Sequence, residues 1–206
     1  MRIQGANVLL TGASSGIGRA LAVELARRGT KRIVLVARRE DVLQEVATEV
    51  KQAGAEPLVI AADVGDRASI EACVARAEQE TGGLDIVIAN AGIGSGKGNK
   101  RVASDEVVRI TNVNYFGAAW TLLAAAEPMR RRRRGQLVSV SSLAALRGLP
   151  ISTEYSASKA ALDSLVEGMR LQLKRDGITV TNIRPGYVDT PLTRGNRSSG
   201  LDVGLR

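Results

Sequence analysis

The sequence predicts a doubly wound α/β domain with a parallel β-sheet. Short runs rich in Val, Ile and Leu alternate with longer segments whose apolar residues recur at the helical period. This alternation is typical of βαβ units, in which helices cover both faces of a parallel sheet. A glycine-rich segment at residues 11–18 separates the first apolar run from the first helical segment, which is where a sheet of this class turns into its first helix.

The apolar runs and helical segments define the elements in order. We expect strands near residues 6–11, 32–37, 57–61, 84–89, 136–141 and 178–184, and helices near residues 17–28, 40–53, 67–81, 104–130 and 154–175. Because crossovers between parallel strands are right-handed, the natural arrangement is a Rossmann-type sheet with strand order 3-2-1-4-5-6 and no seventh strand. Its switch point lies between the first and fourth strands, and ligands of such sheets lie beyond the carboxyl ends of the strands.

The predicted domain covers residues 1–192. Residues 193–206 are polar and show little periodicity, so we expect an irregular or poorly ordered tail. Glycine is densest over residues 92–98, which predicts a mobile loop.

The chain carries a formal net charge of +8, and residues 130–134 are five consecutive arginines. Such a run can contact a polyanion or a membrane surface, or it can be a solvated helix end where cations interact favourably with the helix dipole. We favour the helix end. Aromatic residues make up 2% of the chain, too few to form stacking platforms for nucleic acid, so we expect no nucleic-acid partner.

Composition also argues against several classes of protein. The apolar runs are too short to span a bilayer, and the N-terminal residues lack the apolar stretch of a secretory signal, so we expect a cytoplasmic protein with no membrane segment. The absence of histidine excludes a serine–histidine triad and a histidine-ligated metal, and no metal site is expected. The single cysteine, Cys73, cannot form an intramolecular disulfide. Cys73 and Trp120 lie in helical patterns and are predicted to be packing residues.

The glycine-rich turn predicts a dinucleotide site. Gly12 permits a tight turn, Gly16 lets the backbone approach a pyrophosphate, and Gly18 allows close packing of the helix on the strand. The N-terminus of the following helix favours the negative charge of the phosphates. The hydroxyls of Ser14 and Ser15 can add hydrogen-bond donors.

The end of the second strand indicates which dinucleotide is bound. An acidic residue there binds the ribose diol of NAD, whereas arginine complements the 2′-phosphate of NADP. The sequence has Ala37 followed by Arg38 and Arg39. Arg38 therefore favours NADP(H), and a solvent-facing basic loop is the alternative interpretation.

Tyr155 and Lys159 are four positions apart on a predicted helix, which places them on one face. A free tyrosine has a pKa of about 10, so a nearby cation has to lower that pKa before the phenol can transfer protons efficiently near neutral pH. Lys159 can be that cation. Tyrosine and lysine also occur at this spacing by chance on many helices, so the pair alone identifies no enzyme.

Several motifs together resemble the short-chain dehydrogenase/reductases, a family of oxidoreductases. These motifs are the turn at residues 11–18, Asn-Ala-Gly at 90–92, Ser142 thirteen residues before Tyr155, the Tyr155/Lys159 pair, and Pro-Gly at 185–186. They follow the family's order over residues 5 to about 192.

The resemblance implies a catalytic set of Tyr155, Lys159, Ser142 and Asn114. Tyr155 is then the general acid in carbonyl reduction and the general base in alcohol oxidation, and Lys159 also holds the nicotinamide ribose. Ser142 hydrogen-bonds the substrate oxygen, and Asn114 helps to carry a water-linked proton relay. As hydride leaves the cofactor for a carbonyl carbon, hydrogen bonds from Tyr155 and Ser142 stabilise the charge that builds on the oxygen.

The resemblance also implies which residues surround the cofactor. Asp63 contacts the adenine, Asn90 steadies the sheet beside the cofactor, and Val188 with Thr190 meets the carboxamide end. The expected cofactor-binding residues are Gly12, Ser14, Ser15, Gly16, Ile17, Gly18, Arg38, Asp63, Val64, Asn90, Ala91, Gly92, Tyr155, Lys159, Pro185, Gly186, Val188 and Thr190.

Two assignments have neighbouring alternatives. Ser141 competes with Ser142, and the spacing to Tyr155 favours Ser142. Asn112 competes with Asn114, and the family pattern favours the asparagine that directly follows a valine.

The sequence therefore predicts an oxidoreductase that transfers a hydride between NADP(H) and a small-molecule carbonyl/alcohol substrate. A non-catalytic NADP(H)-binding sensor or scaffold is the alternative. Family members ordinarily continue past Pro-Gly with a substrate-covering segment, another helix and a seventh strand, so we expect either a naturally short chain or one given without its last segment. A homodimer through the helices near 104–130 and 154–175 is the expected assembly.

Overall fold

The computed structural model describes residues 3–95, 101–150 and 152–193. Of the tail predicted over residues 193–206, residues 194–206 lie outside these ranges, as do the glycines at 96 and 98. The elements in chain order are β1 (Asn7–Thr11), α1 (Gly16–Arg27), β2 (Arg32–Ala37), α2 (Glu40–Gln52), β3 (Glu56–Ala61), α3 (Arg67–Thr81), β4 (Ile86–Ala89), α4 (Ser104–Thr111), η1 (Asn112–Gly117), α5 (Ala118–Arg132), β5 (Gly135–Val140), η2 (Leu143–Leu146), α6 (Thr153–Leu173), η3 (Lys174–Asp176) and β6 (Ile178–Ile183).

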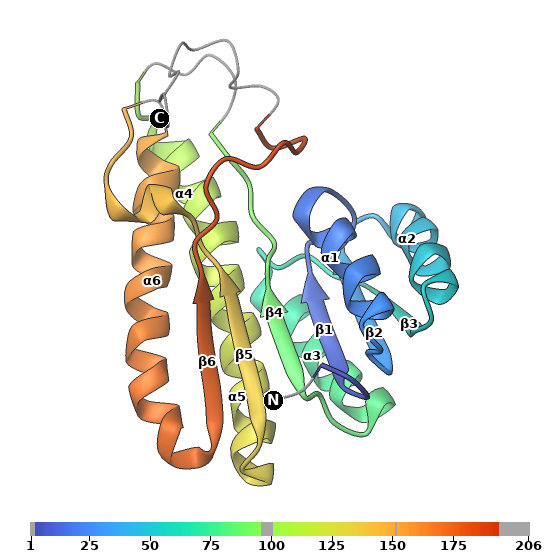
Figure 1. The fold of residues 1–206 in the computed structure, drawn as a ribbon. Helices are drawn as coiled ribbons and strands as arrows, with labels where there is room; N and C mark the ends of the chain where they lie inside the picture. Colours follow the sequence, from blue (N-terminus) through green and yellow to red (C-terminus); the bar gives the residue numbers. More distant parts are fainter. Residues whose placement is uncertain (1–2, 96–100, 151, 194–206) are drawn as a thin grey trace, which may run out of the picture.

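The described residues form a six-stranded parallel sheet with the order β3-β2-β1-β4-β5-β6 (Figure 1). This confirms the predicted fold class and strand order. The chain leaves β1 toward β2 on one side, and β4 pairs with β1 on the other. The carboxyl ends of β1 and β4 therefore lie side by side at the point where the strand order reverses, which is where ligands bind in sheets of this type.

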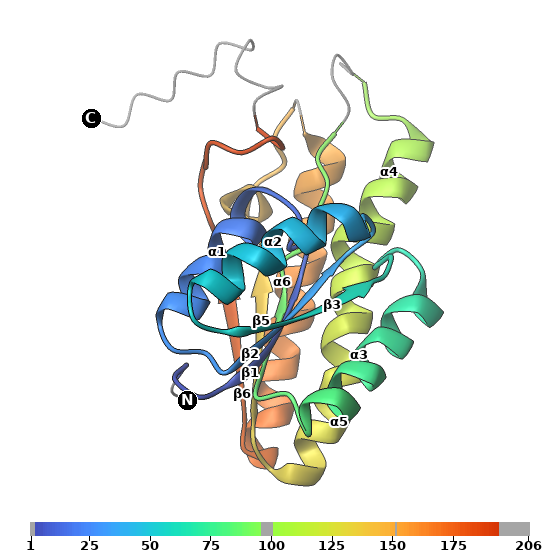
Figure 2. The same cartoon turned by 90° about the vertical axis from the view of Figure 1, so that its right-hand side faces the viewer.

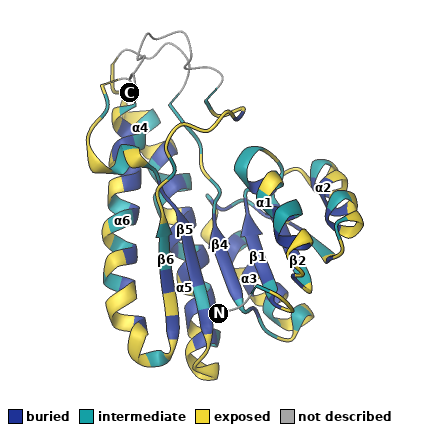
Figure 3. Ribbon diagram, in the orientation of Figure 1, coloured by how far each residue is buried: buried dark blue, intermediate teal, exposed yellow. Residues whose placement is uncertain are grey.

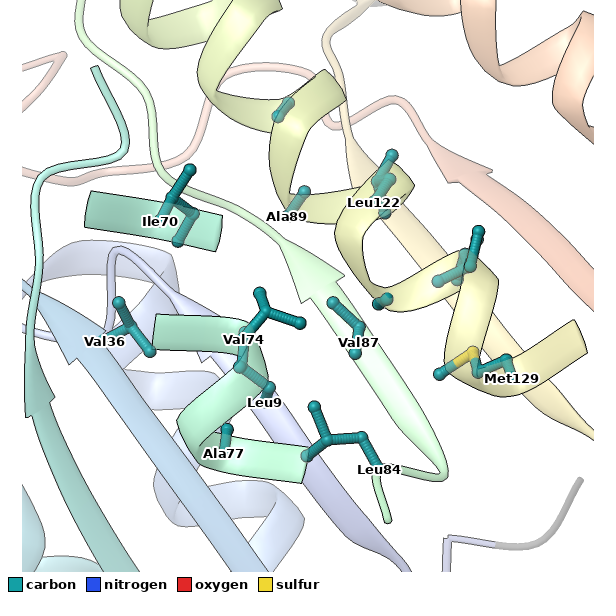
Figure 4. Packing of buried hydrophobic residues seen from close by; sticks show 14 of the residues in the cluster. Leu9, Val36, Ile70, Val74, Ala77, Leu84, Val87, Ala89, Leu122 and Met129 are labelled. Carbon is teal, nitrogen blue, oxygen red and sulfur yellow. The ribbon is translucent and has the colours of Figure 1, made fainter. Parts of the chain in front are cut away.

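Alternate residues of the central strands enter two separate hydrophobic cores. Val8 and Leu10 of β1 belong to the core beneath α1 and α2, whereas Leu9 belongs to the core beneath α3, α5 and α6. This period of two follows from the pleat of a strand, which points successive side chains to opposite faces. Figure 2 shows α1 and α2 on one side of the sheet, and Figure 4 shows Leu9 and Val87 packing against Val74 of α3 and Leu122 of α5.

The sheet is less completely covered at β6 than the sequence predicts. Ile178 and Val180 are buried in the core beneath α6, but Thr179 and Ile183 on this strand are exposed. Figure 3 shows the contrast between β6 and the buried central strands. The expectation that helices cover both faces of the sheet is therefore met at the centre and not at this edge of the described structure.

The helix predicted over residues 104–130 is divided into α4, the π-helical turn η1 and α5. The reason is tertiary, because the side chain amide of Asn112 donates to the Gly65 carbonyl at 2.8 Å and a Cβ on Gly117 would lie 2.8 Å from the Val64 carbonyl oxygen. The helix thus presses against the loop after β3 at this turn. Single π-turns inside helices are frequent at functional sites, and this one carries Asn114.

The arginine run caps and fastens the end of α5. Arg130 donates to Asp176 at 2.9 Å, Arg132 to Glu78 at 2.7 Å, and Arg133 to the Arg175 carbonyl at 2.9 Å. Arg131 and Arg134 contact Glu127 and Asp85. All five arginines have such partners at the end of α5, so the run is the end of a helix. This is the interpretation favoured from the sequence.

The remaining sequence features singled out above are packing residues. Cys73 is buried in the core beneath α3, where burial raises the pKa of its thiol to about 11. Trp120 packs against the same core and stacks on Phe116 with a ring-centroid distance of 5.6 Å. Both predictions are confirmed. Among the helices of the described ranges, none is long and apolar enough to cross a membrane.

Two neighbouring positions on α2 test the assignment of the core. Leu43 is fully buried against the sheet, whereas Gln44 is exposed. Leu43→Ala should lower the free energy of unfolding by about 2–5 kcal/mol, because a large buried side chain is lost and a cavity remains. Gln44→Ala should change it by less than about 0.5 kcal/mol. Urea unfolding followed by circular dichroism measures both, and equal effects of the two substitutions would contradict the described core.

Candidate active site

The glycine-rich turn after β1 is a place of unusually close backbone approach. A Cβ on Gly12 would lie 2.8 Å from the Ala91 Cα, and a Cβ on Gly18 would overlap the Gly12 carbonyl oxygen. Gly12 and Gly16 also have φ values of +70° and +53°, a region that glycine enters without steric penalty. These positions therefore require glycine, and they keep the turn free of side chains on the surface of α1 and β4.

Thr11 and Asn90 lock the ends of β1 and β4 together beneath this turn. The backbone amides of Asn90 and Ala91 both donate to the Thr11 hydroxyl at 3.1 Å. The Asn90 side chain amide donates to the Thr11 carbonyl at 3.0 Å. The switch point of the sheet is thus held rigid by side chains whose hydrogen bonds are directed at the backbone.

The N-terminus of α1 has the character of an anion site. Ser15 is the N-cap residue, but its side chain makes no capping hydrogen bond, and the first turn of the helix contains no acidic residue. The amide groups at the start of a helix lack intrahelical partners and lie at the positive end of its dipole. This end of α1 therefore suits the phosphates of a dinucleotide, and the glycine-rich turn after β1 leaves room for them.

A cavity of about 490 Å³ begins at this turn and extends along the carboxyl ends of the strands. Its lining includes every cofactor-binding residue predicted from the sequence, together with Ser142. Among the described residues, the structure thus brings the phosphate turn, the end of β2, and the Tyr155/Lys159 pair to one continuous cavity.

Tyr155, Ser142 and Lys159 meet at one end of the cavity. Ser142 lies close enough to the Tyr155 phenol to lower its pKa, and the Lys159 ammonium lies 5.9 Å from the centre of the Tyr155 ring. Ser142 is fixed because it begins the short helix η2 and its hydroxyl accepts from the Ala144 amide at 3.1 Å. Tyr155 and Lys159 are one helical turn apart on α6, so the spacing seen in the sequence does place both on the cavity.

The Tyr155 pKa differs in direction from the sequence-based expectation. Burial raises the pKa of this phenol, and the Ser142 side chain opposes that effect. The expected lowering by Lys159 is not found among the protein groups, since desolvation disfavours the phenolate. The side chains are close enough to interact, but their arrangement alone does not make the phenol acidic.

Lys159 is held as a buried cation. Its ammonium donates to the Val140 carbonyl at 2.8 Å, and the residue is 3% exposed. Burial lowers the pKa of Lys159 to about 8, and the charge of Asp163 opposes this shift. The side chain thus remains mostly protonated at neutral pH.

Asn114 lies behind the cavity and does not line it. This residue is fully buried, its side chain oxygen accepts from the Ile93 amide at 2.8 Å, and its amide donates to the Ile93 carbonyl and to Ser158. A Cβ on Gly92 would lie 3.4 Å from the Asn114 oxygen and 3.5 Å from the Lys159 nitrogen. The side chains of Asn114 and Lys159 therefore both lie close to the backbone of Gly92.

The two neighbouring alternatives occupy different places. Asn112 binds the Gly65 carbonyl through its side chain, away from Lys159. Ser141 is buried behind Ser142, with its hydroxyl donating to the Lys159 carbonyl at 3.4 Å. Ser142, in contrast, reaches Tyr155.

The adenosine end of the cavity is basic at the end of β2. Arg38 and Arg39 are exposed and both line the cavity beside Ala37. Asp63 lines it from the end of β3, where its carboxylate accepts from the Gly65 amide at 2.9 Å. Among the residues that the structure describes, Ala37, Arg38 and Arg39 form the end of β2 and the start of the following loop, and none of them is acidic.

Sequence reasoning missed several lining residues, namely Ala37, Arg39, Ala62, Ile93, Arg109, Val113, Val140, Ser141, Pro191, Leu192 and Thr193. Arg39 and Val113 are neighbours of predicted residues, so a wider window on each motif finds them. Arg109 had no such signal, because it reaches the cavity from α4 and donates to Glu106 and to the Gly94 carbonyl. Thr193 belongs to a defined turn, in which its hydroxyl donates to the Val188 carbonyl at 2.7 Å, and not to an irregular tail.

Comparison with known proteins places this arrangement in one family. The family model described as short chain dehydrogenase matches residues 6–200. The chain therefore belongs to the short-chain dehydrogenase/reductase family, and it is an oxidoreductase. An uncharacterized oxidoreductase of Myxococcus xanthus (strain DK1622) is 44% identical over 188 residues, a match that covers 91% of this chain and 74% of the relative.

Solved structures share the fold. A crystal structure of an NAD⁺-bound xylitol dehydrogenase superposes with a TM-score of 0.85 at 30% identity and covers 91% of this chain and 72% of that one. An alcohol dehydrogenase from the archaeon Thermococcus sibiricus, complexed with 5-hydroxy-NADP, gives a TM-score of 0.82 at 31% identity and covers 89% of this chain and 77% of the other. The family uses NAD(H) or NADP(H), and this chain spans about three quarters of the length of these relatives.

Proposed function

We propose that the protein transfers a hydride between NADP(H) and a carbonyl/alcohol substrate, with Tyr155 as general acid in reduction and general base in oxidation. One observation carries the proposal: Tyr155, whose phenol is acted on by Ser142 and which lies beside the buried Lys159, lines the same cavity as the glycine-rich turn. Such a cavity can hold a dinucleotide from its phosphates to a reactive ring and offers hydroxyl donors at that ring.

The residues of the cavity fit a nicotinamide dinucleotide. The turn at residues 12–18 and the uncapped start of α1 would hold the pyrophosphate, Asp63 and Val64 the adenine, and Lys159 the nicotinamide ribose. When bound, the cofactor supplies the hydride, and its oxidised ring adds a positive charge near Tyr155. That added charge matters because burial raises the phenol pKa in the protein alone.

The side chains of the site have separate tasks. The hydroxyls of Tyr155 and Ser142 donate hydrogen bonds to the substrate oxygen, where charge builds during reduction. The Lys159 ammonium, together with the positive charge of the oxidised cofactor, would stabilise the phenolate form, and Asn114, which lies behind the cavity, would support a water-linked proton relay past Gly92. Val188 and Thr190 would meet the carboxamide end from the segment that follows β6.

Tyr155→Phe tests the mechanism. The substitution keeps the ring but removes the proton that completes the alcohol, so kcat for NADPH oxidation with a panel of carbonyl compounds should fall by about 10²–10⁴-fold. The Kd for NADPH should be nearly unchanged. Tyr187 is 73% exposed and does not line the cavity, so Tyr187→Phe is the matched control and should keep wild-type activity.

Two results would contradict the mechanism. One is full activity in Tyr155→Phe. The other is a wild-type protein that binds NADPH but turns over no substrate in the panel, which would favour a sensor or scaffold.

The preference for NADP(H) rests on the basic end of β2. Arg38→Asp should weaken NADPH binding and reduce the ratio of NADH to NADPH dissociation constants, because a carboxylate repels the 2′-phosphate and accepts from the ribose diol. Lys31→Asp makes the same charge change at an exposed position at the opposite end of β2 and should leave the ratio unchanged. Isothermal titration with both cofactors measures the ratio, and an unchanged ratio in Arg38→Asp would remove the basis for the preference.

We also propose that the chain forms a homodimer through α4, η1, α5 and α6. Large apolar side chains are exposed on these elements: Val108 (69%), Phe116 (43%), Leu123 (52%) and Leu171 (72%). Exposed apolar side chains on a helix surface favour association, because a partner that covers them removes them from water. Such exposure on these four elements supports the assembly, with a second copy as the partner.

The mass in solution tests the dimer. Sedimentation should give twice the chain mass at micromolar concentration, and Leu123→Glu should shift the equilibrium toward monomer because a carboxylate is costly to bury. Leu146→Glu introduces the same group at an exposed position on η2 and should leave the dimer intact. A wild-type mass equal to one chain at every concentration would overturn the assembly.

A further inference from the structure

Asp163 lies one turn beyond Lys159 on α6, so Tyr155, Lys159 and Asp163 follow one another at intervals of four residues. Residues at this spacing share a helix face. The side chain of Asp163 is 12% exposed, which is unusual for a carboxylate without a partner. Nothing in the sequence motifs assigns it a task.

The carboxylate of Asp163 collects donors from the neighbouring strands. One oxygen accepts from the Asn182 side chain amide at 2.7 Å, and the other accepts from the Arg184 guanidinium at 2.6 Å. The Asn182 oxygen in turn accepts from the Ser139 hydroxyl of β5 at 2.7 Å. Asp163 therefore links α6 to the ends of both β5 and β6.

This network anchors the chain where it enters the site. Arg184 directly precedes Pro185 and Gly186, which line the cavity, and the Pro185 carbonyl accepts from the Leu143 amide, next to Ser142, at 3.0 Å. The Ser141 amide is held by the Ile183 carbonyl at 2.8 Å. The same carboxylate thus fixes the exit of β6 and, through it, the segment that carries Ser142.

Asp163 is also the anion that acts on Lys159. Burial alone would raise the pKa of Asp163, but the nearby Ser141 side chain, the hydrogen bonds from Asn182 and Arg184, and the Arg184 charge lower it. The group is therefore ionised. Its charge opposes the loss of the Lys159 proton, which burial promotes.

We propose that Asp163 is a positioning residue for the reaction: it keeps Lys159 charged and ties the segment after β6 to the catalytic helix. Because Asp163 acts through Lys159 and Ser142, this role depends on the proposed function. Among the described residues, the titratable groups that face Lys159 are Tyr155 and Asp163 from α6 and, through Asp163, Arg184, which directly follows β6. The neutral side chains on this side are those of Ser141, which directly follows β5, and of Asn114 in η1.

The pH profile of Asp163→Asn tests this role. The amide keeps the size of the side chain but removes the charge that raises the Lys159 pKa, so that pKa falls and the basic limb of kcat/KM moves to lower pH by about one unit. Such a shift means about a tenfold loss relative to wild type at pH 9 and little loss at pH 6. Glu167→Gln removes an exposed carboxylate one turn further along α6 and should leave the limb in place.

Arg184→Gln separates the charge effect from a general loosening of the site. Removing this cation leaves the Asp163 charge less compensated, so the basic limb should move to higher pH, opposite to Asp163→Asn. Shifts of opposite sign support the proposal. The proposal is overturned if the basic limb of kcat/KM is unchanged in Asp163→Asn, or if the limb moves in the same direction in both variants. If Asp163→Asn does not fold, Arg184→Gln decides alone: an upward shift supports the proposal, and none overturns it.

The dissociation constant of NADPH over the same pH range is a second readout that needs no turnover. Lys159 would hold the nicotinamide ribose, so weakening of NADPH binding at high pH should begin about one unit lower in Asp163→Asn. Full activity in Tyr155→Phe would contradict the proposed function. An unshifted profile of NADPH binding against pH in Asp163→Asn would contradict the role of Asp163.

Discussion

The ammonium group of Lys159 lies where burial penalises charge, and the surrounding chain compensates for that penalty. The Val140 carbonyl accepts its hydrogen bond at 2.8 Å, Asp163 supplies the opposite charge from the next turn of α6, and Gly92 leaves the space in front of it open. A buried cation without such partners loses its proton. The placement of α6 across β5 and β6 therefore governs both the geometry and the protonation of the site.

The close approach at the other end of the cavity depends on a different constraint. Gly12 and Gly18 bring α1, β1 and β4 nearer than any side chain permits, and Thr11 with Asn90 holds the two strand ends in that position. The phosphate end is therefore built from backbone, and the catalytic end from side chains on a helix. Both ends open at the carboxyl edge of one parallel sheet, which explains how motifs 140 residues apart line one cavity.

The sequence predicted the strand order from local patterns, and it predicted the residues of the cavity because its motifs resemble those of the short-chain dehydrogenase/reductases. Alternating apolar runs define the strands, and right-handed crossovers leave few orders for them. The predictions were weaker where a contact between distant segments decides the outcome. The π-helical turn at Asn114 results from packing against the loop after β3, the raised Tyr155 pKa results from burial, and Arg109 reaches the cavity through tertiary packing. The Asp163 network joins three elements whose side chains carry no recognisable spacing.

The central claim is that the Tyr155 phenol becomes acidic when the positive charges of Lys159 and the oxidised cofactor act on it together. The most direct measurement is the ultraviolet titration of tyrosinate with NADP⁺ bound, in which Tyr155→Phe is subtracted from wild type to isolate this one phenol. The account predicts that the pKa of Tyr155 in the complex lies below the ordinary value of about 10. A value at or above 10 with the cofactor bound would contradict it.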